Sequence, residues 1–234
     1  VAMAKEAPED PFAGLADPSQ LTTNIQTETL ELFDPSDEPD PAALQEDATR
    51  AEAAALRNAG VSQVQSASAG YGRRRIHLAA TNGFSAGYAR SDRGLSCVAI
   101  SGTGAGMERD YDYDSRVFQA DLRDADEIGR IAAERAVERI GAKKPKTGAY
   151  PVLFDERVAS ALIGSLLQAT NGMMIARGSS WLRDAIGEQV LPDHLSIIED
   201  PHRARVTGSR LFDAEGLATS RRAIVDNGVL TGWT

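Results

Sequence analysis

The sequence has few of the residues from which several kinds of site are built. Cys97 is the single cysteine among 234 residues, which excludes an internal disulfide framework and a metal cluster held by cysteines alone. The three histidines are His77, His194 and His202, and no H-E-x-x-H motif occurs, so a self-sufficient zinc hydrolase is hard to build from this chain. No apolar run reaches the roughly 18 residues that a membrane-spanning helix needs. We therefore expect a cytoplasmic protein with no membrane partner.

Acidic residues outnumber basic ones in this chain. It has 34 Asp and Glu residues against 25 Lys and Arg residues, which makes a formal net charge of −9. Binding to nucleic acid phosphates needs a cationic surface, so direct nucleic acid binding is not expected. Apolar residues make up 42% of the chain, which is enough to build a globular core.

The first part of the chain changes from a proline-rich segment to a helical one. Prolines and short polar residues punctuate residues 1–41, which we expect to be an extended linker. Asp40-Pro41 is a typical helix start, with the aspartate as N-cap and the proline in the first turn. We expect this helix to reach Asn58 and to be closed by Gly60.

Residues 42–144 are expected to combine helices with a sheet. Alternation of apolar and polar residues predicts an antiparallel meander of about five strands. These strands are Val61–Ala69, Arg74–Thr81, Phe84–Ser91, Leu95–Ser101 and Met107–Asp114. Asn82-Gly83 is a strong hairpin signal, and Asp92-Arg93-Gly94 predicts another turn. A helix from Asp124 to Gly141 is expected to help cover one face of the sheet.

The glycine-rich stretch Gly102–Gly106 invites comparison with a phosphate-binding loop. Met107 stands where a dinucleotide-binding fingerprint needs its third glycine, and a strand rather than a helix is expected to follow. We interpret the stretch as a turn between two strands.

Residues 145–234 are expected to begin a second, mixed β-rich domain. A strand at Tyr150–Phe154 precedes a helix that Asp155 caps, whose inner face runs from Val158 to Ala169 and which Asn171-Gly172 ends. Further predicted elements are a short helix at Ser179–Ile186 and strands at Leu195–Ile198, Arg222–Asp226 and Val229–Trp233. The predicted class is therefore α+β: an antiparallel meander sheet with covering helices, then the start of a second domain, in a chain that we expect to be truncated at both ends.

Four carboxylates alternate along one predicted strand and so share one of its faces: Glu108, Asp110, Asp112 and Asp114. Their spacing of about 7 Å is too wide for a single hard cation. We interpret them as a solvated face that protects a sheet edge, with recruitment of a basic partner as the alternative.

The remaining residues that could take part in catalysis or metal binding are better explained by structural roles. Cys97 lies among apolar residues with no histidine nearby in the sequence, so we expect a buried, inert thiol rather than a nucleophile. His194 and His202 flank Glu199-Asp200, but extended chain would hold the two imidazoles about 26 Å apart, which argues against a shared metal unless Pro201 folds the segment back.

Several strings, in their order and spacing, resemble a known family. They include Ala7–Leu15, Ser68-Ala69-Gly70-Tyr71, Thr81–Phe84, Val152–Asp155, Leu195–Asp200 and Phe212-Asp213-Ala214-Glu215-Gly216. Together they resemble the TldD/PmbA proteins, which also go by the name modulator of DNA gyrase. The resemblance implies a cytoplasmic, metal-dependent protease built from two related subunits, of which one carries an H-E-x-x-x-H zinc motif on a helix and the PmbA (TldE) type lacks it.

The resemblance also implies which of the two subunits this chain is. Matching the helix after Asp155 to the zinc helix places Gly164 and Ala169 at the histidine positions and Ser165 at the glutamate position. Glycine and alanine supply no zinc ligand, and no residue there supplies the base for a metal-bound water. We therefore expect no catalytic or metal-binding residue and no cofactor in this chain, with zinc in a TldD-like partner.

A peptide substrate is expected to add as a strand along a sheet edge, somewhere within Arg74–Ser101 or near Phe212–Gly216. Individual substrate-binding residues are not predicted. When alone, the chain is expected to be able to form a homodimer. Two alternatives stay open: an acidic binding module that modulates DNA gyrase or another partner with a basic surface, and a free-standing hydrolase that uses Cys97 or a serine.

Overall fold

The computed structural model describes residues 5–6 and 14–234, so residues 7–13 of the Ala7–Leu15 string and much of the start of the expected linker lie outside the described residues. The chain divides into two compact units, Val1–Ala142 with His202–Thr219, and Lys143–Pro201 with Ser220–Thr234. Both units combine helices with an antiparallel sheet, which confirms the α+β class. None of the helices in the described part is long and apolar enough to cross a membrane.

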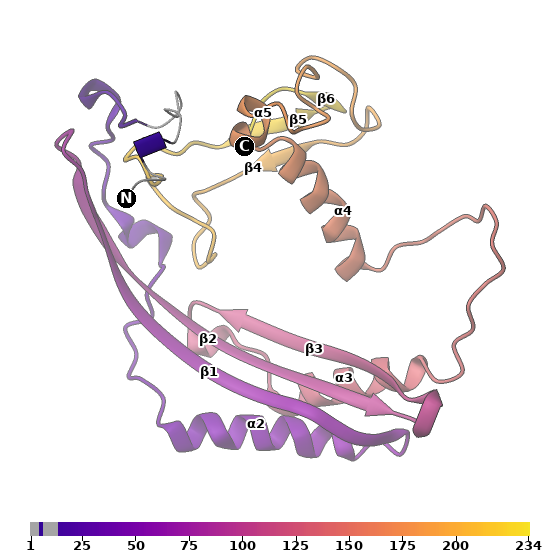
Figure 1. Cartoon of the computed structure of the whole chain (residues 1–234). Helices are drawn as coiled ribbons and strands as arrows, with labels where there is room; N and C mark the ends of the chain where they lie inside the picture. The colour runs from indigo at the N-terminus through magenta and orange to yellow at the C-terminus, as the bar shows by residue number, and fades with distance from the viewer. Residues whose placement is uncertain (1–4, 7–13) are drawn as a thin grey trace. The chain divides into compact units, whose positions relative to one another are not determined.

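The first unit contains a sheet of three long strands, β1 (Val61–Ala79), β2 (Ser85–Ser101) and β3 (Glu108–Arg116), in the order β1-β2-β3 (Figure 1). The meander is confirmed, but the prediction of about five short strands is wrong. Gly70 pairs with Gly94 and Tyr71 pairs with Arg93, so the chain runs straight through both segments. Glycine is compatible with an extended strand when a partner strand supplies the hydrogen bonds, and local turn propensity is then overridden.

The predicted turns between β1, β2 and β3 are confirmed. Gly83 has a φ of +96° in the hairpin turn, and its N–H donates to the carbonyl of Ala80 at 3.1 Å. Gly102 has a φ of +71°, and a Cβ there would lie 2.6 Å from the carbonyl oxygen of Gly106, so only glycine fits. Short 3-10 turns complete the local structure at Pro18–Gln20, Thr27–Leu30, Gly104–Gly106 and Gln119–Asp121.

Two helices, α2 (Pro41–Leu56) and α3 (Ala125–Glu138), pack against one face of this sheet (Figure 1). Both start at the predicted aspartate caps: Asp40 accepts from the N–H of Ala42, and Asp124 accepts from that of Asp126. The prediction that Gly60 caps α2 is wrong, because Arg57 follows the last helical residue and Gly60 instead makes room for Val137, which lies 2.5 Å from where a Cβ would be. The core between helices and sheet is made mostly of small side chains, with Leu95 and Ile128 as the larger members: Ala51, Ala55, Leu95, Cys97, Ala99, Ala125, Ile128, Ala132, Ala133 and Ala136.

Segments from two distant parts of the chain cover the hairpin end of β1 and β2. Leu30 and Leu32, expected in the linker, and Leu211 and Phe212, expected in the second domain, form a shared core there with Phe84 and Ala86. Arg90 of β2 donates to the carbonyls of Thr207 and Ser209, which ties the returning segment to the strand. Residues 202–219 therefore belong with the first compact unit.

The second unit contains α4 (Glu156–Ala169), α5 (Gly172–Ala176) and a small sheet of β4 (Ile197–Glu199), β5 (Arg222–Asp226) and β6 (Val229–Leu230). Asp155 caps α4 as predicted. Leu166 and Ala169, near the end of this helix, are buried with residues of the small sheet, whereas Val158 and Leu162 are about half exposed. The predicted inner face is therefore realised only in the last turns of the helix.

Two further predictions for this unit are wrong, whereas the predicted end of α4 at Asn171 is confirmed. Tyr150–Phe154 is not a strand, and its Leu153 side chain is 99% exposed. Asn171 does end α4, but its side chain also accepts from the N–H groups of Met173 and Met174 and so caps a new helix, α5. The residues expected to form the next helix, 179–186, form turns instead.

Candidate functional site

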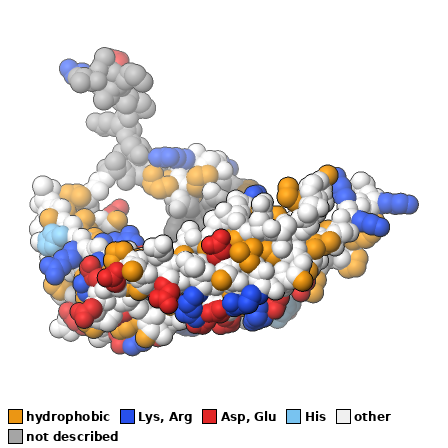
Figure 2. All heavy atoms as spheres, turned by 90° about the horizontal axis from the view of Figure 1, so that it is seen from below, with side chains coloured by type: hydrophobic (Ala, Val, Ile, Leu, Met, Phe, Trp, Pro, Cys, Tyr) orange, Lys and Arg blue, Asp and Glu red, His pale blue; other side chains and the backbone are white. Residues whose placement is uncertain are grey.

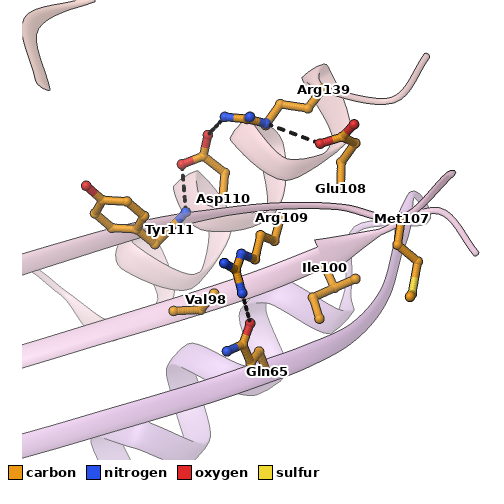
Figure 3. A pocket seen from close by; sticks show the side chains of 9 residues that line it. All are labelled: Gln65, Val98, Ile100, Met107, Glu108, Arg109, Asp110, Tyr111 and Arg139. Atoms are coloured by element: carbon orange, nitrogen blue, oxygen red, sulfur yellow. Dashed lines mark hydrogen bonds and ion pairs between the residues drawn. The ribbon is translucent and has the colours of Figure 1, made fainter. Parts of the chain in front are cut away.

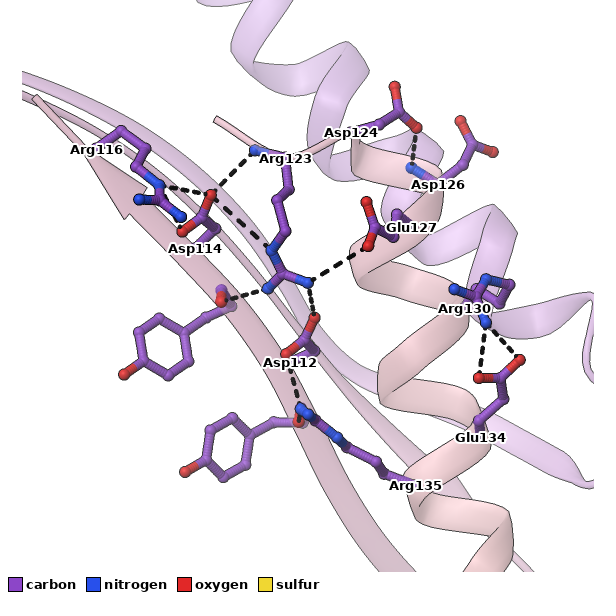
Figure 4. Close-up of polar contacts among 12 residues, drawn as sticks. Asp112, Asp114, Arg116, Arg123, Asp124, Asp126, Glu127, Arg130, Glu134 and Arg135 are labelled. Carbon is purple, nitrogen blue, oxygen red and sulfur yellow. Dashed lines mark hydrogen bonds and ion pairs between the residues drawn. The ribbon is translucent and has the colours of Figure 1, made fainter. Parts of the chain in front are cut away.

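The acidic side chains of β3 lie on the face of the sheet that the helices cover. Asp110 and Asp112 are 7% and 5% exposed, and arginines of α3 and of the residues that flank it pair with both of them. The carboxylate of Asp112 lies 2.9 Å from Arg123 and 2.7 Å from Arg135 (Figure 4), and that of Asp110 lies 3.3 Å from Arg139. The prediction of a solvated carboxylate face is therefore wrong, because the charges are neutralised within the chain.

Asp114, near the end of β3, is the next carboxylate on the same face of the strand. Burial alone would raise the pKa of its carboxyl, but hydrogen bonds from the backbone N–H of Arg123 and from the Arg116 guanidinium outweigh it and hold that pKa below its ordinary value. The carboxylate stays ionised at neutral pH while it is satisfied inside the protein. The acidic strand consequently offers little to a basic partner, and the proposed recruitment surface loses its basis in these residues.

Basic and acidic side chains also pair across the two helices. Arg50 of α2 lies 2.7 Å from Asp124 and 2.6 Å from Asp126, and Arg57 lies 2.6 Å from Asp126. The pKa of Asp126 is lowered by hydrogen bonds from Arg57 and Arg50. Figure 2 shows Lys and Arg side chains intermingled with Asp and Glu on the face that it presents, with no extended patch of one sign.

The opposite face of the sheet carries apolar and aromatic side chains. Tyr111 and Tyr113 stack with ring centroids 6.1 Å apart, and the Tyr113 side chain is 58% exposed. Met107 lies on the same side of β3, and Val98 of β2 lies beside Tyr111 (Figure 3). None of these residues was predicted as functional, although the alternation that places the carboxylates on one face places the tyrosines on the other.

Two hollows lie on this open face, along β3. The first, of about 590 Å³, has Met107 and Tyr111 in its wall and Arg109 reaching across it to donate to the side-chain oxygen of Gln65 at 3.4 Å (Figure 3). The second, of about 460 Å³, is bounded by Ser68 of β1, Ser96 of β2 and Tyr113 of β3, among others. Glu108, Asp110 and Arg139 also line the first hollow, and Arg139 forms ion pairs with both carboxylates. The hollows therefore offer aromatic rings and guanidinium groups to a bound molecule.

The edges of the sheet differ in what they can bind. At β3, the carbonyl of Tyr113 accepts from Arg123 at 2.8 Å and that of Tyr111 accepts from Arg135 at 3.3 Å. The N–H of Tyr111 donates to the Asp110 carboxylate at 2.7 Å. Side chains thus occupy the backbone groups that an added strand would need there.

The two predicted substrate edges must be corrected. Most of Arg74–Ser101 is β2, whose Arg93–Ser101 part lies between β1 and β3 and so is not an edge, whereas Arg74–Ala79 belongs to the edge strand β1. Phe212 is buried and bridges to Ala218, and the carbonyl of Gly216 accepts from the N–H of Thr22. That segment is already paired within the first unit.

The positions matched to the zinc motif lie on α4. Gly164 and Ser165 are exposed, the Ser165 hydroxyl donates to the carbonyl of Ala161 at 2.9 Å, and Ala169 packs in the core of the second unit. A hydrogen atom, a hydroxyl and a methyl group are not the donors that zinc takes, so these three residues do not fit the metal. Within the described residues, no three His, Cys, Asp or Glu side chains come together as a metal site.

The remaining candidates lie apart from the open face. Cys97 is fully buried against α2, as predicted, and burial, with smaller contributions from Glu52 and Asp112, raises the pKa of its thiol to about 11. His202 lies 3.1 Å from the hydroxyl of Thr219, and His77 lies 3.0 Å from that of Ser85. His194 and His202 belong to different units.

Comparison with known proteins assigns both units to one family. The model of the PmbA/TldA metallopeptidase central domain matches residues 34–140, and that of the C-terminal domain matches residues 147–234. The chain belongs to the PmbA/TldD family. The predicted resemblance is therefore confirmed.

Relatives in the PmbA/TldD family match this chain over part of their own length. The protein named metalloprotease PmbA from Escherichia coli O157:H7 is 35% identical over 99% of this chain and 51% of its own. A homologue from Haemophilus influenzae is 39% identical over 64% of this chain and 33% of its own. The chain thus spans about half the length of the Escherichia coli relative.

Solved structures share the PmbA/TldD fold. A protein from Bacteroides thetaiotaomicron, named as a candidate modulator of DNA gyrase, matches with a TM-score of 0.89 and 29% identity, over 99% of this chain and 53% of its own. TldE from Thermococcus kodakarensis matches with a TM-score of 0.69 over 100% of this chain and 52% of its own. At 18% identity, that second likeness shows the fold alone.

Proposed function

We propose that this chain is the non-catalytic, PmbA/TldE-type subunit of a cytoplasmic metallopeptidase that cleaves peptides and small unfolded proteins. Family membership and the 35% identical relative named metalloprotease PmbA support a role in proteolysis. The observation that carries the subunit assignment is the chemistry of Gly164, Ser165 and Ala169, which lack zinc-ligating atoms. Zinc would then be held by a TldD-like partner, and this chain would help to hold the substrate.

The open face of the first unit supports that holding role. Exposed tyrosine rings and a methionine offer apolar contact to varied side chains without demanding one sequence, which suits a subunit that handles many peptides. Arg109 adds a cation that can pair with a carboxylate of the substrate.

The experiment is a reconstitution with metal analysis. This chain and a zinc-motif-bearing family member are purified separately and together, and the peptidase activity and zinc content of each sample are measured. We expect activity only in the mixture, abolished by a chelator, with far less than one zinc per chain in this chain alone. About one zinc per chain in this chain alone, or chelator-sensitive cleavage by it alone, would overturn the proposal.

A second measurement addresses assembly. Light scattering after size-exclusion chromatography should show a complex of the two chains when they are mixed, and we expect a homodimer when this chain is alone. A chain that stays separate from its zinc-bearing relative at micromolar concentration, and that does not change the relative's activity, contradicts the heteromeric arrangement.

A further inference from the structure

Residues 202–219, which we call the strap, leave the second unit and return to it. The strap connects β4 to β5, and these two strands pair with each other. Its ends also lie close together, since His202 lies 3.1 Å from the hydroxyl of Thr219. The strap itself packs with the first unit, so the chain passes between the units at three places: after Ala142, before His202 and after Thr219.

Aromatic side chains at the hairpin end of β1 and β2 hold the strap by apolar contact. Phe212 of the strap lies edge-on to Phe84 and Tyr88, with ring centroids 5.1 Å and 5.6 Å apart. Gly216 lies against the Phe84 ring, where a Cβ would be 2.6 Å from the nearest ring atom, so only glycine fits. The carbonyl of Gly216 accepts from the N–H of Thr22 at 2.9 Å. One buried ring and one close backbone approach therefore seat the strap.

A second contact of the strap is made by two residues with unusual backbone conformations. Glu31 has a φ of +46° and Arg205 one of +58°, in the left-handed region that such residues rarely adopt. Their side chains pair at 2.9 Å, and the N–H of Arg205 donates to the carbonyl of Leu30 at 2.9 Å. In the described part of the chain, the third residue of this kind is Asn227, which lies in a hairpin turn where asparagine is ordinary. Backbone strain is therefore found on both sides of one contact.

The same contact is held together by charge. The Arg205 guanidinium lies 3.2 Å from the carboxylate of Asp121 and 4.0 Å from the centroid of the Phe118 ring. The side chains of Arg205, Glu31 and Asp121 are 42%, 44% and 38% exposed. Because salt screens ion pairs that solvent reaches, the attraction that opposes the strain depends on ionic strength.

We propose that the strap is a salt-sensitive latch, which docks on the first unit and releases from it, with Glu31 and Arg205 as its catch. Strained backbone conformations persist only where the surrounding contacts hold them, and they are common at clamps and switches. A left-handed residue other than glycine lowers the docked population about five- to thirtyfold relative to a relaxed backbone. Two such residues at one contact therefore bring the docked and released states close enough in free energy for weakened ion pairs to shift the balance.

Release of the strap has two consequences for the chain. The connection after Ala142 then becomes the one passage that joins the two units, in place of three. Release also removes Thr207 from the wall of a hollow of about 310 Å³, which Leu32, Tyr88 and Arg90 border as well. The latch thus controls both how the second unit is attached and how far this hollow is open.

The positions of the lysines allow a direct test that needs neither zinc nor a partner subunit. The chain has four lysines, Lys5, Lys143, Lys144 and Lys146, so a lysine-specific endoproteinase cuts between the units only in the exposed connection after Ala142. The cut chain is then analysed by size-exclusion chromatography over a dilution series, at about 0.05 M and about 1 M NaCl. A docked strap keeps the two fragments together, whereas a released strap lets them separate.

We expect the dissociation constant of the two fragments to rise about fivefold between low and high salt, because two exposed ion pairs are screened. Arg205→Ala should raise it about tenfold at low salt and should remove most of the salt dependence. Arg205→Gly also lacks the guanidinium but relieves the left-handed strain, so its fragments should bind about fourfold more tightly than those of Arg205→Ala.

Arg203→Ala is the matched control, because this arginine of the strap contributes its carbonyl, which accepts from the Ser209 hydroxyl at 2.7 Å. It should leave the dissociation constant within about twofold. Phe212→Ala removes the buried ring and should separate the fragments at either salt concentration, and Phe212→Leu should have a smaller effect in the same direction. Circular dichroism melts of the uncut variants show that each one folds.

Four results would overturn the latch. Fragments of the native chain that separate at low salt would show that the strap does not dock. Fragments of Phe212→Ala and Phe212→Leu that bind each other as tightly as the native ones would show that the strap does not join the units. An equal salt dependence in the native chain and in Arg205→Ala would remove the ionic catch. Equal dissociation constants for Arg205→Gly and Arg205→Ala would remove the strain.

Discussion

The ion pairs between β3 and α3 predict a specific loss of stability when Asp112 becomes Asn. Breaking a fully buried ion pair costs about 3–5 kcal/mol, whereas an exposed pair is worth about 0.2–1 kcal/mol. The Asp112 side chain is 7% exposed, but those of Arg123 and Arg135 are 29% and 26% exposed, so solvent screens part of the interaction. We therefore expect Asp112→Asn to lower the free energy of unfolding of the first unit by about 2 kcal/mol.

Urea denaturation measures this change. With a slope of about 2 kcal/mol per molar urea, the midpoint should fall by about 1 M. Far-UV circular dichroism reports the first unit together with the second, whereas both tryptophans, Trp181 and Trp233, lie in the second unit. Tryptophan fluorescence of the same samples thus follows the unmutated unit and serves as an internal reference.

The control is an exposed pair on the same helix. Arg130 and Glu134 lie 2.7 Å apart, but their side chains are 56% and 47% exposed. Glu134→Gln should therefore cost only about 0.3–0.5 kcal/mol. If Asp112→Asn lowers the free energy of unfolding by no more than Glu134→Gln does, the β3 carboxylates behave as solvated surface groups, and the reasoning is refuted.

Three further predictions concern the core of the first unit and its titration. Gly129→Ala should lower the free energy of unfolding by about 1–3 kcal/mol, as measured by urea denaturation, despite the better helix propensity of alanine. The reason is that the added Cβ would lie 2.0 Å from the carbonyl oxygen of Ala51. A stabilised variant would contradict this close approach. The pKa of Asp114 is lowered in the folded chain, so its contribution is present above the ordinary carboxyl pKa of about 3.9 and is lost as pH falls through the lower folded value. Asp114→Asn should be less stable than the native chain at pH 7 and should lose this difference as the pH falls through the lowered pKa of the folded chain, and a pH-independent difference would refute the assignment. The Cys97 thiol, buried and with a pKa raised to about 11, should react with a thiol reagent at pH 8 only after unfolding, and rapid labelling of the folded chain would show that it is accessible.

Short stretches of sequence were enough to predict where most helices begin and where the main hairpin turns. The caps at Asp40, Asp124 and Asp155 act through side-chain hydrogen bonds to N–H groups two residues ahead, so no distant contact is needed to read them. The Asn82-Gly83 turn is equally local, because positive φ is easily reached by glycine. The apolar surroundings of Cys97 likewise predicted its burial.

Tertiary structure decided what those local signals left open. Alternation along β3 showed that its carboxylates share a face, but only the packing of α3 decided that this face is inside and that the tyrosines are outside. Arg135 and Arg139 lie one helical turn apart, and this spacing was the available signal in the sequence that α3 pairs with the carboxylates. Their partners, however, lie more than twenty positions away in the sequence.

The same reason explains the strand count and the occupied edge of β3. Gly70 and Gly94 have turn propensity on their own, and each is held extended by the other across the hairpin. The carbonyls at the β3 edge accept from Arg123, which lies just before α3, and from Arg135 of α3, a fact that no single strand contains. Sequence therefore determined many of the elements and the family, whereas the burial and pairing of the charges follow from contacts between residues far apart in the chain.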